Sequence, residues 1–349
     1  MQEDDSGFLY PHVDVEACVD CHRCEQVCPC LNDAETPNGQ PVEALAAMTA
    51  DEATRMVSSS GGVFSLLAGE VIAQGGAVFG ARFDGNWHVV HDVADSIDGL
   101  DALRGSKYVQ SVIGDNFCKA EGLLKQGRKV LFSGTPCQIA GLRLFLGKEY
   151  DNLLLVEVAC HGVPSPKVWR QYLGEASLSR VNFRDKSTGW KNYSVVIGAV
   201  SRPHDDDEFM GCFLKNYTLR PSCFDCRFKA GQSGADITLA DFWGIQTIVP
   251  HLDDNKGTSL VIVNTAKGSE WMARCPIERE TVNYGDAVKA NPSIVHSATR
   301  PGDYEAFWQA LDDMGTRRAL KKYGKLYPTG LLYRLKRVLS RLLNMGARH

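Results

Sequence analysis

Four cysteines near the amino terminus have the spacing of an iron–sulfur cluster site. Cys18, Cys21, Cys24 and Cys28 follow one another in the order C-x2-C-x2-C-x3-C, and Pro29 comes directly after the last of them. Bacterial ferredoxins use this order to hold cubane clusters. Zinc sites more often use two separated Cys-x-x-Cys pairs, so a zinc site or a disulfide framework is the alternative interpretation. The spacing predicts that the first three thiolates bind one face of a [4Fe-4S] cube.

The fourth ligand of this run is an open question. In two-cluster ferredoxins the last cysteine of each run ligates the cluster of the other run, and the chain contains no second run of this type. Cys30, two residues beyond Cys28, is a candidate replacement ligand. We expect either that a first run precedes Met1, with the start assigned too far downstream, or that this module holds one cluster. The character of the residues from Asp5 onward favours the first explanation.

A second group of cysteines follows predicted strands. Cys137 lies in Phe-Ser-Gly-Thr-Pro-Cys-Gln, after a strand and at the start of a helix, and Cys160 ends the next strand. If these strands are neighbours, both thiols lie at the carboxyl edge of the sheet, where open α/β folds bind ligands. Cys223 and Cys226 form a Cys-x-x-Cys pair. The four thiols would suffice for a second cube, although each alone also fits a core residue, half a zinc site or a redox pair.

The other cysteines and the composition limit the class of protein. We assign Cys118, Cys212 and Cys275 to the core. Twelve cysteines in 349 residues, with no signal peptide and no apolar stretch long enough to cross a bilayer, indicate a reducing cytoplasm where thiols serve metals or catalysis. The net charge is -4, yet the last acidic residue is Asp313 and basic residues dominate after it. The acidic remainder of the chain argues against nucleic-acid binding.

The cysteines need a scaffold, and the hydrophobic pattern predicts an α/β one. We expect helices at 63–73, 116–126, 138–145 and 166–173, alternating with strands at 77–83, 129–132 and 153–158. This alternation predicts a mainly parallel sheet. Later strands are predicted at 193–200, 237–240 and 259–264, separated by longer loops. They would complete a mixed sheet or form a second lobe.

The sequence resembles the beta subunit family of coenzyme F420-reducing hydrogenase and F420-dependent dehydrogenases, which also includes 7-hydroxymethyl chlorophyll a reductase. The resemblance runs from about Gly7 to Tyr323. It is most specific in five stretches: Ser58–Gly62, Arg104–Ser111, Phe132–Gly141, Cys160–Ser165 and the Cys223 pair. It implies an α/β (α+β mixed sheet) FAD-binding domain with a small N-terminal ferredoxin-like module. It also implies a flavin-proximal [4Fe-4S] cluster with four ligands: Cys137, Cys160, Cys223 and Cys226.

Four regions follow from this resemblance. Residues 1–40 would form the ferredoxin-type module, shortened at its start. Residues 55–135 would form the N-terminal region of the beta subunit, and 136–313 its C-terminal region with FAD and the second cluster. Residues 314–349 are predicted to be a basic, amphipathic helical tail that lies on an anionic membrane face or docks on protein.

Candidate flavin-binding residues lie in three motifs. Ser59, Ser60, Gly61 and Gly62 precede a predicted helix, so their backbone could cradle a flavin pyrophosphate, although such a segment is often only a helix cap. Two further pairs are candidates: Lys107 and Tyr108 for a phosphate or a ring, and Thr135 and Gln138 beside the isoalloxazine. His161 is a candidate proton donor, or a histidine that holds the cluster loop by a hydrogen bond.

The predicted function is an electron relay. Flavin would exchange a hydride with a small substrate, such as the deazaflavin F420, while one or two [4Fe-4S] clusters carry single electrons. The predicted partner is an electron-donor or acceptor protein, either ferredoxin-like or a hydrogenase/dehydrogenase subunit. The predicted location is the cytoplasm, with possible peripheral contact at the inner membrane face. The alternatives are a non-catalytic iron–sulfur carrier or redox sensor, tied to polysaccharide biosynthesis in some relatives, and a zinc-stabilised scaffold.

Overall fold

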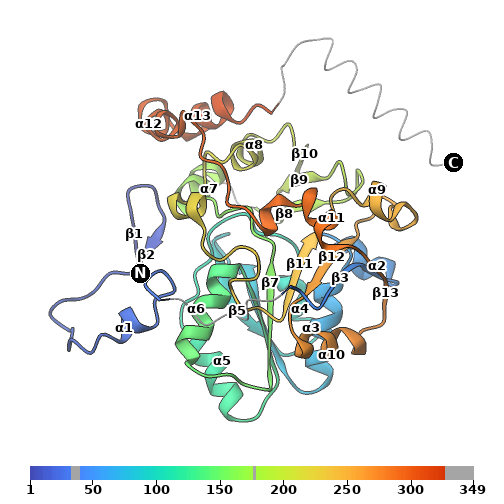
Figure 1. Ribbon diagram of the computed structural model, residues 1–349. Coiled ribbons are helices and arrows are strands. Elements are labelled where there is room, and N and C mark those ends of the chain that lie inside the picture. The colour runs from blue at the N-terminus through green and yellow to red at the C-terminus, as the bar shows by residue number, and fades with distance from the viewer. Residues whose placement is uncertain (33–39, 176–177, 327–349) are drawn as a thin grey trace.

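The computed structural model describes residues 1–32, 40–175 and 178–326. Its centre is one large sheet. The sheet consists of β3 (Glu43–Thr49), β4 (Ala77–Phe83), β5 (Val89–Ala94), β6 (Val130–Gly134), β7 (Leu153–Val158), β11 (Ile237–Asp241), β12 (Ser259–Val263) and β13 (Ile277–Thr281). These strands lie in the order β13-β3-β12-β11-β7-β6-β4-β5 (Figure 1).

The sheet is parallel only at its centre. Strands β11, β7, β6 and β4 are parallel neighbours, whereas β5, β12, β3 and β13 pair antiparallel with the strands beside them. The expectation of a mainly parallel sheet is therefore wrong for the outer strands. A parallel pair needs a long crossover connection, and the short link between β4 and β5 allows only a hairpin. The broader prediction of a mixed α/β sheet is confirmed.

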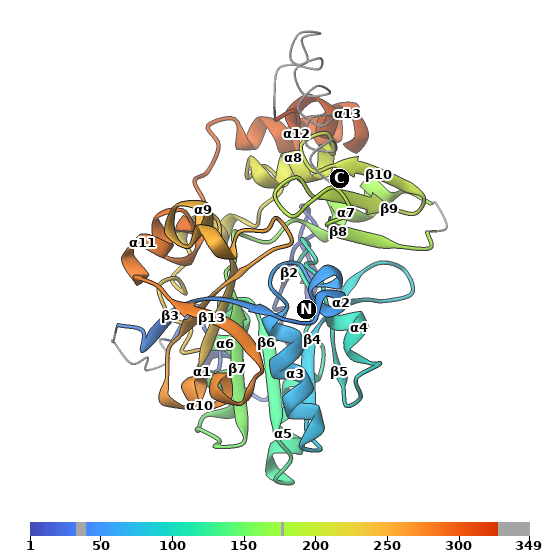
Figure 2. The same ribbon diagram turned by 90° about the vertical axis from the view of Figure 1, so that its right-hand side faces the viewer.

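Helices cover both faces of the sheet. One face packs against α3 (Val63–Ala73) and α10 (Ala266–Arg274), and the other against α5 (Asn116–Lys125) and α6 (Pro136–Leu146) (Figures 1 and 2). Successive residues of a strand point to opposite faces. In β6, Leu131 accordingly joins the first core and Phe132 the second. Because the central strands are buried on both faces, they read as continuous apolar runs.

A second lobe lies above the carboxyl edge of the central strands in Figure 1. It contains a three-stranded antiparallel sheet of β8 (Val181–Asp185), β9 (Ser194–Ile197) and β10 (Val200–Pro203). Its helices are α7 (Pro166–Leu173), α8 (Glu208–Leu214), α12 (Tyr304–Met314) and α13 (Thr316–Tyr323). The single strand predicted at 193–200 is wrong, because Gly198, with φ 58°, turns the chain between β9 and β10.

The remaining elements are short. They are β1 (Gln2–Glu3), β2 (Leu9–Tyr10), α1 (Arg23–Gln26), α2 (Glu52–Val57), α4 (Leu100–Leu103), α9 (Ile245–Ile248) and α11 (Tyr284–Lys289), with 3-10 turns at Pro221–Asp225, Pro250–Leu252 and Pro292–Ile294. Of the predicted tail, 327–349 lies outside the described residues. In the part of the chain that is described, no helix has the length and apolar character needed to cross a membrane. The proposed domain limits stay predictions.

The central strands make a stability prediction possible. Leu154 of β7 is fully buried in the core, so Leu154→Ala should lower the free energy of unfolding of the apoprotein by about 2–5 kcal/mol. Val158, on the same strand, is 43% exposed, and Val158→Ala should change it by no more than about 0.5 kcal/mol. Urea unfolding followed by circular dichroism measures both. Equal effects of the two substitutions would contradict this assignment of the core.

Candidate functional site

The two strand-end cysteines meet at one edge of the sheet. Strands β6 and β7 are parallel neighbours, as the sequence analysis required, and Gly134 is paired with Glu157. Cys137 lies in the first turn of α6, whose N-cap is Thr135, and Cys160 lies two residues beyond the end of β7. The parallel pairing therefore places both cysteines beyond the same ends of neighbouring strands.

The Cys-x-x-Cys pair is brought to the same edge by a local bridge. Pro164, in the loop after β7, pairs antiparallel with Leu219, and the Arg220 N–H donates to the carbonyl of Val163 at 3.0 Å. Cys223 lies in the 3-10 turn that follows. The Cys226 N–H donates to the Ser297 hydroxyl at 2.9 Å, which anchors the end of the pair.

The thiols of this set lie within electrostatic range of one another. Burial raises the pKa of Cys137, Cys160 and Cys223, and the charges of other cysteines in the set also raise these three pKa values. For Cys223 the resulting pKa is about 11. The Cys137 side chain has exposed surface, so its desolvation comes from surrounding protein rather than from a sealed interior. Neighbouring thiols that resist ionisation suit a positively charged iron–sulfur centre, because such a centre stabilises thiolates.

No group of three or more His, Cys, Asp and Glu side chains in the described ranges is arranged to hold a single metal ion. A cube differs from a single ion, because its four irons are separate corners and each takes its own thiolate. Ligands of a cube therefore stand farther apart than ligands of one zinc. The donor set of Cys137, Cys160, Cys223 and Cys226 fits a [4Fe-4S] cluster.

The N-terminal run lies beside this site. Cys18, Cys21 and Cys24 are exposed, and α1 contains the third of them. The module contacts α6 at two points: Arg23 donates to the Phe145 carbonyl at 3.1 Å, and Pro29 Cγ lies 3.7 Å from the position that a Cβ on Gly141 would occupy. The carboxyl end of the run thus packs against the helix that carries Cys137.

A polar chain behind the cluster site holds the α6 N-terminus in place. Gln138 Oε1 accepts from the Thr135 N–H at 2.9 Å, and Gln138 Nε2 donates to the Ser111 hydroxyl at 2.8 Å. That hydroxyl lies 2.9 Å from His91 Nδ1, and His91 Nε2 lies 3.1 Å from the carbonyl of Ser133. Since a carbonyl only accepts, Nε2 carries the proton and Nδ1 accepts from Ser111. Burial lowers the pKa of His91 to about 4, so the ring stays neutral.

The Gln138 side chain therefore contacts other protein groups and supports the N-terminus of α6, whereas the Thr135 side chain lies next to Cys137. The Thr135 hydroxyl lies 3.2 Å from Cys137 Sγ. His161 Nε2 lies 2.6 Å from Asn216 Oδ1, and the amide of Asn216 donates to the Thr299 carbonyl. Burial lowers the pKa of His161, and the hydrogen bond opposes this. These contacts favour the interpretation in which His161 holds the cluster loop, and its role as a proton donor stays a prediction.

The Ser58–Gly62 loop is packed into the protein backbone. The Ser60 hydroxyl donates to the Thr258 carbonyl at 2.8 Å, and the Gly61 N–H donates to the hydroxyl of Ser259 at 3.0 Å. A Cβ on Gly61 would lie 2.4 Å from the Ala47 carbonyl oxygen, and Gly62 has φ 85°. Close backbone packing thus explains why residue 61 is a glycine, and the positive φ explains why residue 62 is one. In the first turn of α3, which begins at Val63, the Ser65 N–H already donates to the Gly62 carbonyl at 3.0 Å, so the amides of Val63 and Phe64 are the candidates for a phosphate.

Two of the predicted flavin motifs are adjacent. The Ser59 hydroxyl accepts from the Ser106 N–H at 2.8 Å and lies 2.9 Å from its hydroxyl. Lys107 donates to the carbonyls of Ala102 and Arg104, and burial lowers its pKa to about 7. Tyr108 stacks on Phe213 with ring centroids 4.7 Å apart. The Lys107 ammonium and the Tyr108 ring are thus engaged with protein groups.

Sequence reasoning missed two buried cations beside this loop. Lys186 donates to the carbonyls of Arg55, Ser60 and Lys256, and burial together with the Arg55 charge lowers its pKa to about 7. Arg184 pairs with Asp241 at 2.9 Å, although its Nε is buried and has no hydrogen-bond partner among the described residues. Burial disfavours the Arg184 charge, but the Asp241 carboxylate outweighs this and raises its pKa. The sequence signal that could have revealed Arg184 is the alternating pattern of the short strand β8, in which the apolar residues Val181 and Phe183 are separated by a polar one.

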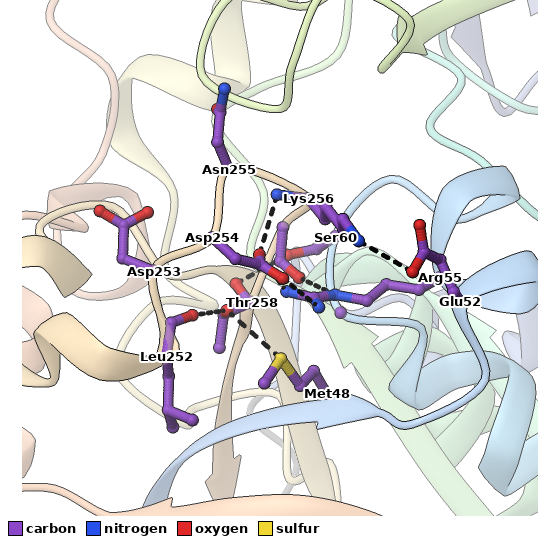
Figure 3. Close-up of polar contacts among 12 residues, drawn as sticks. Met48, Glu52, Arg55, Ser60, Leu252, Asp253, Asp254, Asn255, Lys256 and Thr258 are labelled. Atoms are coloured by element: carbon purple, nitrogen blue, oxygen red, sulfur yellow. Dashed lines mark hydrogen bonds and ion pairs between the residues drawn. The ribbon is translucent and has the colours of Figure 1, made fainter. Parts of the chain in front are cut away.

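Ion pairs clamp the loop at 253–258 onto α2, the helix that precedes the Ser58–Gly62 loop. Arg55, in α2, pairs with Asp254 at 2.7 Å, and Lys256 pairs with Glu52 at 2.8 Å (Figure 3). Thr258 donates to the Leu252 carbonyl at 2.7 Å and closes the loop on itself. The clamp holds the carbonyls that surround Lys186.

The core assignment of the three remaining cysteines is correct for two of them and wrong for the third. Cys212 and Cys275 are buried, as predicted. Cys118 is exposed on α5, so the core assignment is wrong for this residue. Its neighbours Asn116 and Ala120 face the core instead, because residues one and two positions apart on a helix do not share a face.

The comparison with known families agrees with the resemblance seen in the sequence. Residues 127–287 match the family model for the C terminus of the coenzyme F420 hydrogenase/dehydrogenase beta subunit. No curated protein matches the chain significantly. Among solved structures, a chain of the xenon-derivatised F420-reducing [NiFe] hydrogenase complex from Methanosarcina barkeri is 17% identical. The similarity covers 84% of this chain and 93% of that one, with a TM-score of 0.49.

Gly61 provides a test of the packing of the loop. Gly61→Ala should lower the free energy of unfolding by about 1–3 kcal/mol, because its Cβ would overlap the Ala47 carbonyl. Gly85→Ala is the matched control, since nothing lies within 4 Å of the added Cβ. Thermal unfolding of the apoproteins measures both. A Gly61→Ala variant as stable as Gly85→Ala would show that packing does not require this glycine.

The buried His91 ring should make the free energy of unfolding depend on pH. In the unfolded chain a histidine has a pKa of about 6.5, and the folded value is about 4, so the unfolded state binds more protons between these values. Stability should therefore fall as the pH falls through this window, with His91 contributing up to about 3 kcal/mol. Urea unfolding between pH 7 and pH 4 measures the slope. His91→Gln should flatten it and Ser111→Ala should retain it, whereas equal slopes in wild type and His91→Gln would contradict the assignment.

Proposed function

We propose that this chain is an iron–sulfur flavoprotein oxidoreductase, since residues 127–287 match the family model for the C terminus of the coenzyme F420 hydrogenase/dehydrogenase beta subunit. The observation that carries the proposal is the group of four thiols at the carboxyl edge of the sheet. They come from α6, the end of β7 and the Cys223 turn, and burial and neighbouring thiols raise the pKa of three of them.

The proposed ligands of the first cluster are Cys18, Cys21, Cys24 and Cys28, with Cys30 as the substitute for the last. The ligands of the second cluster are Cys137, Cys160, Cys223 and Cys226. FAD would lie between the second cluster and the Ser58–Gly62 loop. When bound, the clusters supply single electrons and the flavin exchanges hydride with the substrate.

The protein's own residues would bind and orient these groups. The N-terminus of α3 would present a partial positive charge to a flavin phosphate, and Lys186 and Arg184 would add positive charge. Gln138, held by Ser111, keeps Thr135 and Cys137 in register with β6. His161 fixes the Cys160 loop through Asn216.

The proposed substrate is a deazaflavin such as F420 or another small hydride donor or acceptor. The proposed partner is a protein that delivers or accepts single electrons, ferredoxin-like or a hydrogenase/dehydrogenase subunit. It would dock on the N-terminal module, where Cys18, Cys21 and Cys24 are exposed. The proposed location is the cytoplasm, and the acidic character of the chain upstream of its tail is unsuited to nucleic acid.

An iron, acid-labile sulfide and flavin count on anaerobically purified protein tests this proposal. We expect about four irons and four sulfides for each cluster, together with stoichiometric FAD. The double variant Cys223→Ala/Cys226→Ala should lose about four irons, because the second cluster loses half of its ligands. Cys118→Ala is the matched control, since this cysteine is exposed and apart from both sets, and it should keep the full count.

The outcomes separate the alternatives. Clusters without any flavin after anaerobic reconstitution would favour a non-catalytic electron carrier or redox sensor. Zinc without iron or sulfide would refute both interpretations and favour a zinc-stabilised scaffold. Full cofactor content with bleaching of the visible absorbance by reduced F420 would support the enzyme.

A further inference from the structure

The last helix of the described chain, α13, carries four cations on one side. All four residues are exposed, and they are Arg317, Arg318, Lys321 and Lys322. Residues four positions apart are neighbours on a helix surface, so Arg317 lies beside Lys321 and Arg318 beside Lys322. The other side of the helix carries Ala319 and Leu320, which are fully buried. These four cations form what we call the basic face of α13.

The orientation of α13 is fixed by its buried side. Figures 1 and 2 both show the helix beside α12, at the end of the second lobe that lies away from the large sheet. Leu320 belongs to the same buried core as Phe307 of α12. Lys215 donates to the carbonyls of Tyr323 and Lys325 at 2.8 Å and 3.1 Å, which anchors the carboxyl end of the helix. The basic face therefore points away from the protein.

The arrangement of these cations does not stabilise the helix itself. Arg317 and Arg318 lie in the first turn, which has no acidic residue and where the helix dipole disfavours positive charge. The two neighbouring pairs on the basic face are like-charged, which also destabilises a helix. Among the described residues, no carboxylate forms an ion pair with any of the four cations, not even Asp312 and Asp313 at the end of α12. Four unpaired cations on one face are suited to an external anionic surface.

The sequence that follows α13 favours a lipid surface as that partner. Residues 327–349 contain six Leu and five Lys or Arg, and they contain no Asp or Glu. Cations combined with large apolar side chains suit the boundary between the headgroups and the acyl chains of an anionic bilayer. The phosphates of a nucleic acid would also attract the cations, but a nucleic acid offers no apolar layer for the leucines.

We propose that the basic face of α13 docks this protein on the surface of an anionic phospholipid bilayer. This inference goes beyond the proposed redox function and does not depend on it. The cations of the face bind lipid phosphates, and the leucine-rich segment that follows supplies apolar contact with the same surface. Each cation at such a surface increases the binding constant by about fivefold. Because α13 and α5 lie at opposite ends of the molecule, the bilayer contacts the second lobe and not the large sheet (Figure 1).

Co-sedimentation of the full-length protein with vesicles tests this proposal. We expect binding to vesicles of phosphatidylcholine mixed with phosphatidylglycerol, little binding to phosphatidylcholine alone, and weaker binding at higher salt concentration. Arg318→Gln/Lys322→Gln and Arg317→Gln/Lys321→Gln each remove two cations. Each should weaken binding to the mixed vesicles by about twenty-five-fold.

Two further variants serve as controls. Arg318→Lys/Lys322→Arg keeps both charges and should bind as the wild type does. Lys119→Gln/Lys125→Gln changes the net charge by the same amount on α5, at the other end of the molecule, and should also bind as the wild type does. Thermal unfolding of the α13 variants should give a midpoint no lower than that of the wild type, because the removed pairs are like-charged. If one glutamine variant fails to fold, the other decides.

Three results would overturn the proposal. The first is wild-type binding by the glutamine variants of α13, since the basic face would then contribute nothing. The second is equal binding to neutral and anionic vesicles, or a loss in the α5 variant as large as in the α13 variants. The third is tighter binding to a DNA duplex than to the mixed vesicles at the same salt concentration, since the face would then recognise a nucleic acid rather than a bilayer.

Discussion

The candidate site depends on the parallel pairing of β6 with β7. This register places Gly134 opposite Glu157, so the two strands end together and their continuations carry Cys137 and Cys160 to the same edge. A shift of one residue would turn every side chain of a strand to the opposite face, and the two-sided core prevents this. Once these strands are aligned, the bridge at Pro164 needs only a short segment to bring the Cys223 turn to the same place.

Two polar assemblies hold the loops near this edge. In the first, the neutral imidazole of His91, through Ser111 and Gln138, holds the N-terminus of α6. In the second, Lys186 gathers carbonyls of the Ser58–Gly62 loop around a single ammonium group. Both assemblies are buried and have specific geometry, because an unsatisfied polar group in the interior is costly. They fix the loops that the proposed cofactors would contact.

The parts of the fold that were predicted correctly are those with a strong local pattern. The helix at 63–73 and the strands at 77–83 and 153–158 have predominantly apolar runs of suitable length, and the structure has them within the same limits. The β3 strand at Glu43–Thr49 was missed because this alanine-rich segment lacks the β-branched and aromatic residues that usually mark a strand. The 193–200 segment was predicted as one strand because the positive φ of Gly198 cannot be seen in an apolar pattern.

The cysteine chemistry and the α/β class can be inferred from the amino-acid sequence alone, since Cys18 to Cys28 are spaced along a few residues and hydrophobic period is a local property. Two other relations arise only when the chain folds: Cys223 joins Cys137, and Lys186 is buried. They join segments far apart in the chain, and their energies come from burial and from charges that folding brings together. No spacing rule records such contacts, because the distance along the chain carries no information about them.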